Sequence, residues 1–385
     1  MKPTHLHRYR LHLRPLSPIH IGSGQTMDPC EFVPRQQNDG CFLIVVDLPR
    51  LLADLSPARR SEFDRLVARG DFPQLRSWLG QAAASSRHHR FVVQVQEAAF
   101  NEIVSNLDNP QRLGEIHLFT RDPASGRPYL PGSSIKGAIR TAIIDHLAQH
   151  DTQRRAKLQH IAAEIGRQWK QASLGARFEA AVMGNLKDGD RPDLYHDPLR
   201  QLSISDLSMP PDACYIDRIR IVCPKDEPRR AGGSDPSGIV IYRELTWSSL
   251  DDQKIEFSGE VRLAPLLSDR ATMGTQVLPQ SLDVGHICQW CNGFYVPRLT
   301  QELDRFVADE ETADDLSSAA KLPDGECLIR LGHHSHFECV TVGEPFRQPP
   351  RGFGKTRSYA GADPALPLGW AVLRFDPWDD KRQQN

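Results

Sequence analysis

Two long cationic side chains stand four residues apart in the segment PGSSIKGAIR, residues 131–140. The proline and glycine that open this segment stop any earlier helix, and Ser133 or Ser134 can act as the N-cap of a new one. Apolar residues around Ile139 follow the three-and-four spacing of a buried stripe, which leaves Lys136 and Arg140 together on a neighbouring face, near free amides and the positive end of the helix dipole. This arrangement predicts a site for one or two backbone phosphates of a nucleic acid. The alternative is an ordinary amphipathic helix whose charges are solvated.

A second basic segment, RGFGKTR, lies near the carboxyl end of the chain. Gly352 and Gly354 allow a ligand to approach the backbone closely, while Arg351, Lys355 and Arg357 supply positive charge. The segment does not fit a nucleotide-binding phosphate loop, because a proline stands where that loop requires its first glycine. It predicts contact with RNA that does not depend on the base sequence, and the alternative is a flexible basic loop.

Two residues near the first expected strand could support nuclease chemistry. His20 and Asp28 lie in or beside a glycine turn expected at Gly22 and Gly24, and a histidine or aspartate near a scissile phosphate can act as a general base. Neither residue has an evident partner, and an aspartate followed by proline more often shapes a turn. We therefore expect no catalytic residues, with an endoribonuclease acting through Asp28 or His20 as the alternative.

Possible zinc ligands occur in two separate segments, HICQWC and GHHSHFEC. The first places Cys288 and Cys291 close together, with His286 beside them. The second offers three histidines and a cysteine: His333, His334, His336 and Cys339. A tetrahedral site would need both segments to meet in space. Buried thiols and polar loop histidines are the alternative, so we expect no metal and no cofactor.

Hydrophobic patterning indicates the elements that position these residues. Apolar residues alternate with polar ones at Tyr9, Leu11 and Leu13, as in a strand with one buried face. Four further strands are expected in QLSISDLSM, YIDRIRIVCP, GIVIYRELTW and QKIEFSGEVRL. Residues 49–111 suggest an insertion of short helices, residues 144–185 suggest further helix, and a short helix is expected at 299–308. The pattern predicts an α+β protein of two ferredoxin-like units with a helical insertion in the first.

The length of 385 residues suggests two domains. We place the first at residues 1–270 and a degenerate second copy, which carries the glycine-rich loop, at 271–385. A net charge of −2 excludes a global positive field, so any nucleic-acid binding must depend on local clusters of charge. No signal-like leader or long apolar run is evident, which predicts a cytoplasmic protein without membrane contact.

Taken together, these motifs resemble the CRISPR RAMP superfamily. The resemblance rests on LSPIHIGSG, PYLPGSSIKGAIRTA, LSISDLS, YRELTW, FSGEVRL and GFGKTR with PLGW, and it runs from residue 8 to about residue 375. In order and length, the motifs are most similar to the fifth Csm subunit of type III-A effector complexes. The resemblance implies two ferredoxin-like, RRM-type folds in a subunit at the head of the complex, next to the backbone RAMP subunits.

The implied function is to hold the 3′ part of the CRISPR RNA (crRNA) and to support its maturation, with nucleases recruited from elsewhere. Three segments of this chain match RNA-contacting elements of the family: the helix start at 133–140, the loop at 352–357 and the turn formed by Gly22, Ser23 and Gly24. In the backbone subunits of such complexes, an aspartate after the first strand cuts target RNA. Asp28 is its nearest counterpart here, but its surroundings depart from that pattern, so binding is expected rather than cleavage.

Overall fold

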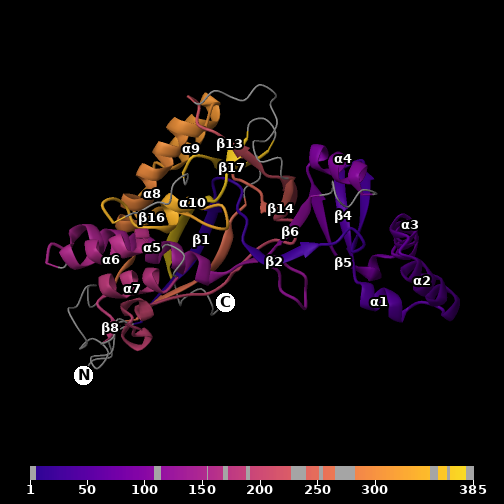
Figure 1. Ribbon diagram of the computed structural model, residues 1–385, viewed down its shortest axis with the longest axis horizontal. Helices are drawn as coiled ribbons and strands as arrows, with labels where there is room; N and C mark the ends of the chain where they lie inside the picture. Colours follow the sequence, from indigo (N-terminus) through magenta and orange to yellow (C-terminus); the bar gives the residue numbers. More distant parts are fainter. Residues whose placement is uncertain are drawn as a thin grey trace.

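Two seven-stranded sheets form the frame of the protein (Figure 1). The computed structural model describes residues 6–107, 114–153, 155–167, 172–187, 191–226, 240–250, 255–264, 282–346, 354–361 and 365–378. The first sheet has the order β16-β19-β1-β15-β11-β7, with β10 also paired to β15. Its strands are β1 (His7–Pro15), β7 (Tyr129–Leu130), β10 (Leu202–Ile204), β11 (Leu207–Ser208), β15 (Phe257–Leu263), β16 (Glu326–Arg330) and β19 (Trp370–Pro377).

The first sheet joins the two ends of the chain. The central strand β1 is antiparallel both to β15, with Leu11 opposite Gly259, and to β19, with Leu11 opposite Phe375. Leu11 and Leu13 are fully buried while Arg10 is exposed, so the predicted alternation is confirmed. Because β19 pairs with β1 and β16 pairs with β19, the first sheet contains strands from both sides of the boundary predicted near residue 270.

The second sheet has the order β2-β6-β14-β12-β5-β4-β3. Its strands are β2 (Gly22–Met27), β3 (Phe32–Gln37), β4 (Gly40–Val46), β5 (His89–Val95), β6 (Glu115–Phe119), β12 (Cys214–Arg218) and β14 (Ile241–Thr246). The strand β5 lies inside the segment predicted to be a helical insertion, and it pairs with β4 and β12. That segment is therefore only partly helical, because residues 89–95 (HRFVVQV), which include three valines and a phenylalanine, form a strand of the second sheet.

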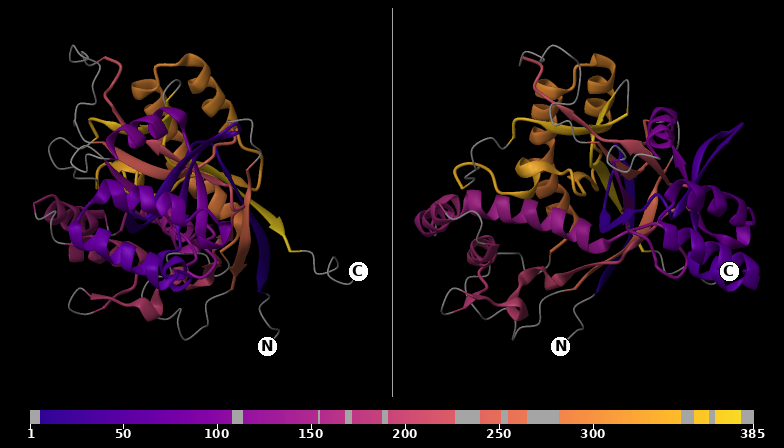
Figure 2. Two further views of the ribbon diagram at one scale, coloured as in Figure 1. Left: turned by 90° about the vertical axis from the view of Figure 1, so that its right-hand side faces the viewer. Right: turned by 45° about the vertical axis from the view of Figure 1, so that its right-hand side comes forward.

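Helices cover one face of the first sheet and share its core. The helices are α5 (Gly132–His150), α6 (Arg155–Arg167), α7 (Ala172–Met183), α8 (Val284–Phe306), α9 (Glu310–Ala319) and α10 (His336–Val340). In α5, the predicted apolar stripe is buried, including Ile135, Ile139 and Ile143. The helix α8 crosses α5 (Figure 2), and the Tyr295 hydroxyl donates a hydrogen bond of 3.1 Å to the Ala138 carbonyl. The helix predicted at 299–308 is the last part of α8.

Smaller elements complete the chain. Four short helices accompany the second sheet: α1 (Leu48–Ala53), α2 (Pro57–Arg69), α3 (Phe72–Ala82) and α4 (Glu97–Asn106). The first three lie at the end of the molecule away from α8 and α9 (Figure 1). Three 3-10 helices in the described part of the chain are η1 (Ser86–His88), η2 (Leu194–His196) and η3 (Pro198–Gln201). The remaining strands are β8 (Leu186–Lys187), β9 (Arg191–Pro192), β13 (Arg220–Val222), β17 (Arg357–Ala360) and β18 (Leu366–Pro367).

The architecture is mixed α+β, as the sequence predicts. The division into two ferredoxin-like units remains a prediction. Within the described part of the chain, no helix combines the length and the apolar character that a bilayer crossing requires.

Candidate nucleic-acid interface

A cavity of about 530 Å³ lies between β2, the amino-terminal half of α5 and the segment that joins β16 to α10. The helix contributes Ser134, Gly137 and Thr141 to its wall, and β2 contributes Gly22 and Gly24. The nitrogen-bearing side chains that line it are His20, His117, Arg243, Arg330 and His333, together with Gln25. None of the described residues that line it carries a carboxylate. A concave site of this size without negative side chains suits an anionic ligand.

The glycine segment beside the cavity is a strand rather than the predicted turn. The strand β2 pairs with β6, but the register shifts between Gly22 and Thr26, so the residues between them depart from regular pairing. Gly24 has a φ of +83°, a conformation that glycine adopts readily. Gly22, Ser23 and Gly24 are all exposed. The sequence suggested a turn because an irregular strand requires the same residue type as a turn.

The start of α5 is tethered within the chain. The helix begins at Gly132, and neither Ser133 nor Ser134 caps it as predicted, because the N-cap residue is Pro131 and no side-chain cap forms. The Asp206 carboxylate instead accepts a hydrogen bond of 2.9 Å from the Gly132 amide. A Cβ at position 132 would lie 2.4 Å from a backbone oxygen between β10 and β11. Only glycine allows this close approach, and the first amide is not free for a phosphate.

The two cations of α5 face the protein rather than the cavity. The Lys136 ammonium donates a hydrogen bond of 2.7 Å to the Leu202 carbonyl, and burial lowers the pKa of Lys136. The Arg140 guanidinium forms ion pairs with Glu179 at 3.0 Å and with Asp197 at 2.7 Å. The prediction that both side chains present free charge to a ligand is therefore corrected. They tie α5 to the segments that pack beside it, since a sequence cannot show which carboxylates meet a helix face.

Both ring nitrogens of His20 lie within hydrogen-bond distance of neighbouring groups. Its Nδ1 atom lies 2.7 Å from the Glu244 carbonyl oxygen, and its Nε2 atom lies 3.0 Å from the guanidinium of Arg243. Because arginine only donates, Nε2 must accept and Nδ1 must carry the proton. Burial lowers the pKa of His20 to about 3, although the carbonyl contact opposes this shift. The imidazole is therefore neutral near pH 7, and its accepting nitrogen is not free to act as a general base.

Asp28 shapes a turn. It is exposed, and its carboxylate accepts a hydrogen bond of 2.8 Å from the Cys30 amide ahead of β3. It is not among the described residues that line the cavity. The structure thus places the two catalytic candidates in different roles and does not pair them.

The glycine-rich segment is described from residue 354 onward, so Arg351 and Gly352 lie outside the described residues. Gly354 has a φ of +77°, and Lys355 is exposed. The Arg357 side chain is only 5% exposed and turns inward. Of the predicted RNA contacts in this segment, Arg357 is therefore corrected to a structural role, and Lys355 keeps its charge on the surface.

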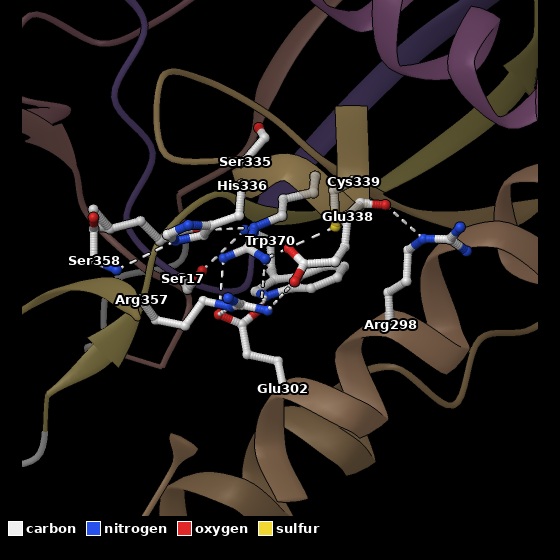
Figure 3. Close-up of polar contacts among 12 residues, drawn as sticks. Ser17, Arg298, Glu302, Ser335, His336, Glu338, Cys339, Arg357, Ser358 and Trp370 are labelled. Atoms are coloured by element: carbon white, nitrogen blue, oxygen red, sulfur yellow. Dashed lines mark hydrogen bonds and ion pairs between the residues drawn. The ribbon is translucent and has the colours of Figure 1, made fainter. Parts of the chain in front are cut away.

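A buried network of charges holds this segment and one wall of the cavity (Figure 3). The Glu302 carboxylate accepts two hydrogen bonds from Arg330, at 2.5 and 2.9 Å, and one of 3.2 Å from the Trp370 indole. Arg357 lies 3.5 Å from Glu302 and donates a hydrogen bond of 3.1 Å to Glu338. Two carboxylates thus balance two guanidinium groups. The network joins α8, β16, α10 and the glycine-rich segment.

The cysteine motif belongs to the core. Cys288 and Cys291 are buried on α8, and their hydrogen-bond contacts with the thiol of Cys327 on β16, together with burial, raise the pKa of Cys327. The His286 ring lies 2.9 Å from the Asp283 carboxylate. The residues of the second proposed half follow β16 or belong to α10: His333, His334, His336 and Cys339, of which Cys339 is buried in the same core. Within the described residues, no three histidine, cysteine or acidic side chains form a group that could hold a metal.

Sequence reasoning missed the central cation of the cavity. Arg243 lies in β14, with His117 beside it on β6 and His333 after β16, and the three are far apart in sequence. The available signal was an arginine and a glutamate in the apolar strand IYRELT. A charged residue in a buried strand needs a partner or a ligand.

The sequence is similar to a known protein family and to curated proteins. The model of the RAMP superfamily matches residues 12–256. "CRISPR system Cms protein Csm5" of Mycobacterium tuberculosis (strain ATCC 25618 / H37Rv) is 26% identical over 63% of this chain and 64% of its own length. The protein of the same name from Streptococcus thermophilus is 26% identical over 36% of this chain and 38% of its own length. The chain thus spans less than two thirds of the curated relatives that it matches.

Two solved structures share the fold. One is a chain of the "Cryo-EM structure of Csm-crRNA-target RNA ternary complex in type III-A CRISPR-Cas system", with a TM-score of 0.67, 18% identity and coverage of 95% of this chain and 100% of that chain. The other is the "Crystal structure of T.onnurineus Csm5", with a TM-score of 0.58, 17% identity and coverage of 94% of this chain and 99% of that chain.

Proposed function

Because this chain belongs to the RAMP superfamily, we propose that it is an RNA-binding subunit of a type III-A CRISPR (Csm) effector complex. In this proposal it holds the 3′ portion of the crRNA and supports guide maturation. Relatives named Csm5 and a structural neighbour in a Csm–crRNA–target RNA complex support the assignment. Its partners are then the crRNA, the backbone RAMP subunits and other Csm proteins, with trimming done by recruited nucleases.

The observation that carries the proposal is the carboxylate-free cavity between β2, α5 and the segment after β16. A phosphate chain needs positive charge, hydrogen-bond donors and room for close approach to the backbone. Arg243 supplies charge, Ser134 and Thr141 supply hydroxyl groups, and Gly24, where a Cβ would meet nothing within 4 Å, leaves the backbone of β2 open. These are the groups that a polyanion requires.

Such a site reads the RNA backbone rather than the bases. Glycine, serine and threonine at the cavity wall can contact phosphate and ribose oxygens, which are the same for every nucleotide. The net charge of −2 limits attraction to RNA elsewhere on the surface. Lys355, exposed in the glycine-rich segment, adds a further phosphate contact in this proposal. A guide RNA of variable sequence requires binding that does not depend on its bases.

Binding of purified protein to unrelated single-stranded RNAs tests the proposal. We expect similar affinities for at least three sequences and a fall in affinity as the salt concentration rises. Ser134→Asp should weaken binding severalfold, because it adds negative charge to the cavity wall. Ser134→Asn is the matched neutral control and should bind like the wild type. Absence of RNA binding, or binding that depends strongly on the bases, would contradict the proposal.

Two further experiments separate the proposal from its alternatives. In a reconstituted Csm complex, omission of this subunit should change the 3′ ends of the bound guides, as sequencing would show. Incubation with labelled repeat RNA, with and without Mg²⁺, tests for endoribonuclease activity. Site-specific products that disappear in Asp28→Ala would replace the binding assignment by a catalytic one. Crosslinks of the assembled complex that join this chain only to protein would instead indicate a scaffold.

A further inference from the structure

Arg243 is a buried cation without an acidic partner. Its side chain is 7% exposed and lines the cavity. One N–H group points to the Nε2 atom of His20, which is a neutral acceptor. Its buried Nε atom has no hydrogen-bond partner among the described residues. Within the same part of the chain, no carboxylate forms an ion pair with it at 4 Å or less.

Other buried arginines of the chain differ from Arg243, because they have an acidic partner. Arg121, Arg330 and Arg357 are also largely buried, and each is paired with a glutamate. Burial of a guanidinium without a counter-ion is unfavourable, because no ion pair offsets the loss of its hydration. Burial accordingly lowers the pKa of Arg243, and the nearby Glu115 offsets this effect only in part. The described residues supply no direct counter-ion to Arg243, so an anionic ligand in the cavity would stabilise its charged form.

The surroundings of Arg243 indicate the class of anion. His117 and His333 also line the cavity, and the positive charge of Arg243 contributes to the lowering of their pKa values after burial itself. The fork of a guanidinium matches two oxygens of one phosphate. His333 is exposed at the rim, and imidazole rings can stack on unpaired bases of single-stranded RNA. A phosphate with an attached nucleoside fits this combination better than a carboxylate does.

We infer that Arg243 anchors one backbone phosphate of single-stranded RNA in the cavity, and that His20 positions the guanidinium by accepting one of its N–H groups. The inference rests on the proposed function and names the residue through which the site holds its ligand. The geometry that carries it is a buried guanidinium that has no ion pair with a described carboxylate and lines a cavity, whose other polar side chains are imidazoles, hydroxyls, Gln25 and Arg330, the last of which is paired with Glu302.

The test compares binding of the full chain to a 20-nucleotide single-stranded RNA, measured by fluorescence anisotropy over a range of KCl concentrations. Arg243→Met should weaken binding about tenfold or more, the range for a hydrogen bond to a charged group. Loss of one phosphate contact should also reduce the slope of log K against log salt by about 0.7. Arg243→Lys, which keeps the charge but loses the fork, should be intermediate. Arg10→Gln, on the open face of the first sheet, is the control and should bind like the wild type.

A second pair of variants avoids changes in the buried strand. Gly137 lies on the exposed face of α5, and a Cβ there would meet nothing within 4 Å. Gly137→Glu adds a carboxylate to the cavity wall, and Gly137→Gln adds the same volume without charge. Both residues favour helix more than glycine does, so both variants should fold. Only Gly137→Glu should weaken RNA binding.

The remaining outcomes separate the inference from the proposed function. If the wild type binds RNA, and Arg243→Met and Gly137→Glu bind it with the affinity and salt slope of the wild type, the role assigned to Arg243 is wrong and the proposed function stands. If the wild type does not bind RNA, but inorganic phosphate raises its melting temperature in an Arg243-dependent manner, the assignment of Arg243 to phosphate binding stands, and RNA as the ligand falls together with the proposed function. If a polyglutamate peptide binds more tightly than RNA through Arg243, the assignment to phosphate is overturned.

Discussion

Glu302→Gln removes the central negative charge from the buried network beneath the cavity. The wild-type carboxylate is 2% exposed and receives hydrogen bonds of 2.5 and 2.9 Å from Arg330, which is 3% exposed. A glutamine keeps one acceptor oxygen but places an N–H₂ group against a second N–H donor. The positive charge of Arg330 then stays buried without its counter-ion. Breaking a buried pair in this way costs about 3–5 kcal/mol of unfolding free energy.

Urea denaturation at pH 7, followed by circular dichroism and tryptophan fluorescence, measures this loss. The control is Glu260→Gln, which interrupts ion pairs with Arg8 and Arg262 at the surface of the first sheet. Exposed pairs of that kind contribute about 0–1 kcal/mol, so the control should unfold almost as the wild type does. The double variant Glu302→Leu with Arg330→Met removes both charges. It should recover most of the stability, because an apolar pair of similar volume has no charge to desolvate.

The same change should loosen the glycine-rich segment. Arg357 retains Glu338 but loses the charge of Glu302, so trypsin should cleave after Lys355 faster in Glu302→Gln than in the wild type. An unfolding free energy within about 1 kcal/mol of the wild type, together with unchanged cleavage, would refute the view that this network stabilises the segment.

Three further predictions follow from other contacts. Arg140→Gln should lower the melting temperature and leave RNA affinity unchanged in an anisotropy titration, because its two ion pairs are internal. Lys355→Gln should lower RNA affinity severalfold without a change in melting temperature, since its ammonium is exposed. Burial lowers the folded-state pKa of His20 to about 3 and those of His334 and His336 to about 2, below 6.5 in the unfolded chain. Below pH 6.5 the unfolded state binds more protons than the folded state, so each histidine should reduce the unfolding free energy by about 1.4 kcal/mol for each pH unit that the pH falls. Urea titrations at pH 7, 6 and 5 measure this loss. An unfolding free energy that does not change with pH would contradict this account.

Local patterning in the sequence determined the type of many elements. The alternation around Leu11 predicted β1, and the three-and-four spacing around Ile139 predicted the buried face of α5. These predictions succeed because side-chain direction repeats every two residues in a strand and about every 3.6 in a helix. The motifs that resemble RAMP proteins also lie within short stretches, and the superfamily match confirms their reading.

The tertiary structure decided which cations are free. Lys136, Arg140 and Arg357 look alike in the sequence as candidates for phosphate binding, yet each meets an internal oxygen from a distant segment. Arg243, inside an apolar strand, gave the weakest sequence signal and lines the cavity without an acidic partner among the described residues. The reason is physical: a charge is neutralised or left available by the groups packed against it, and for these residues the neighbours come from chain segments far away in sequence. Pairing of β1 with β19 brings together residues more than 350 positions apart, which no local pattern encodes.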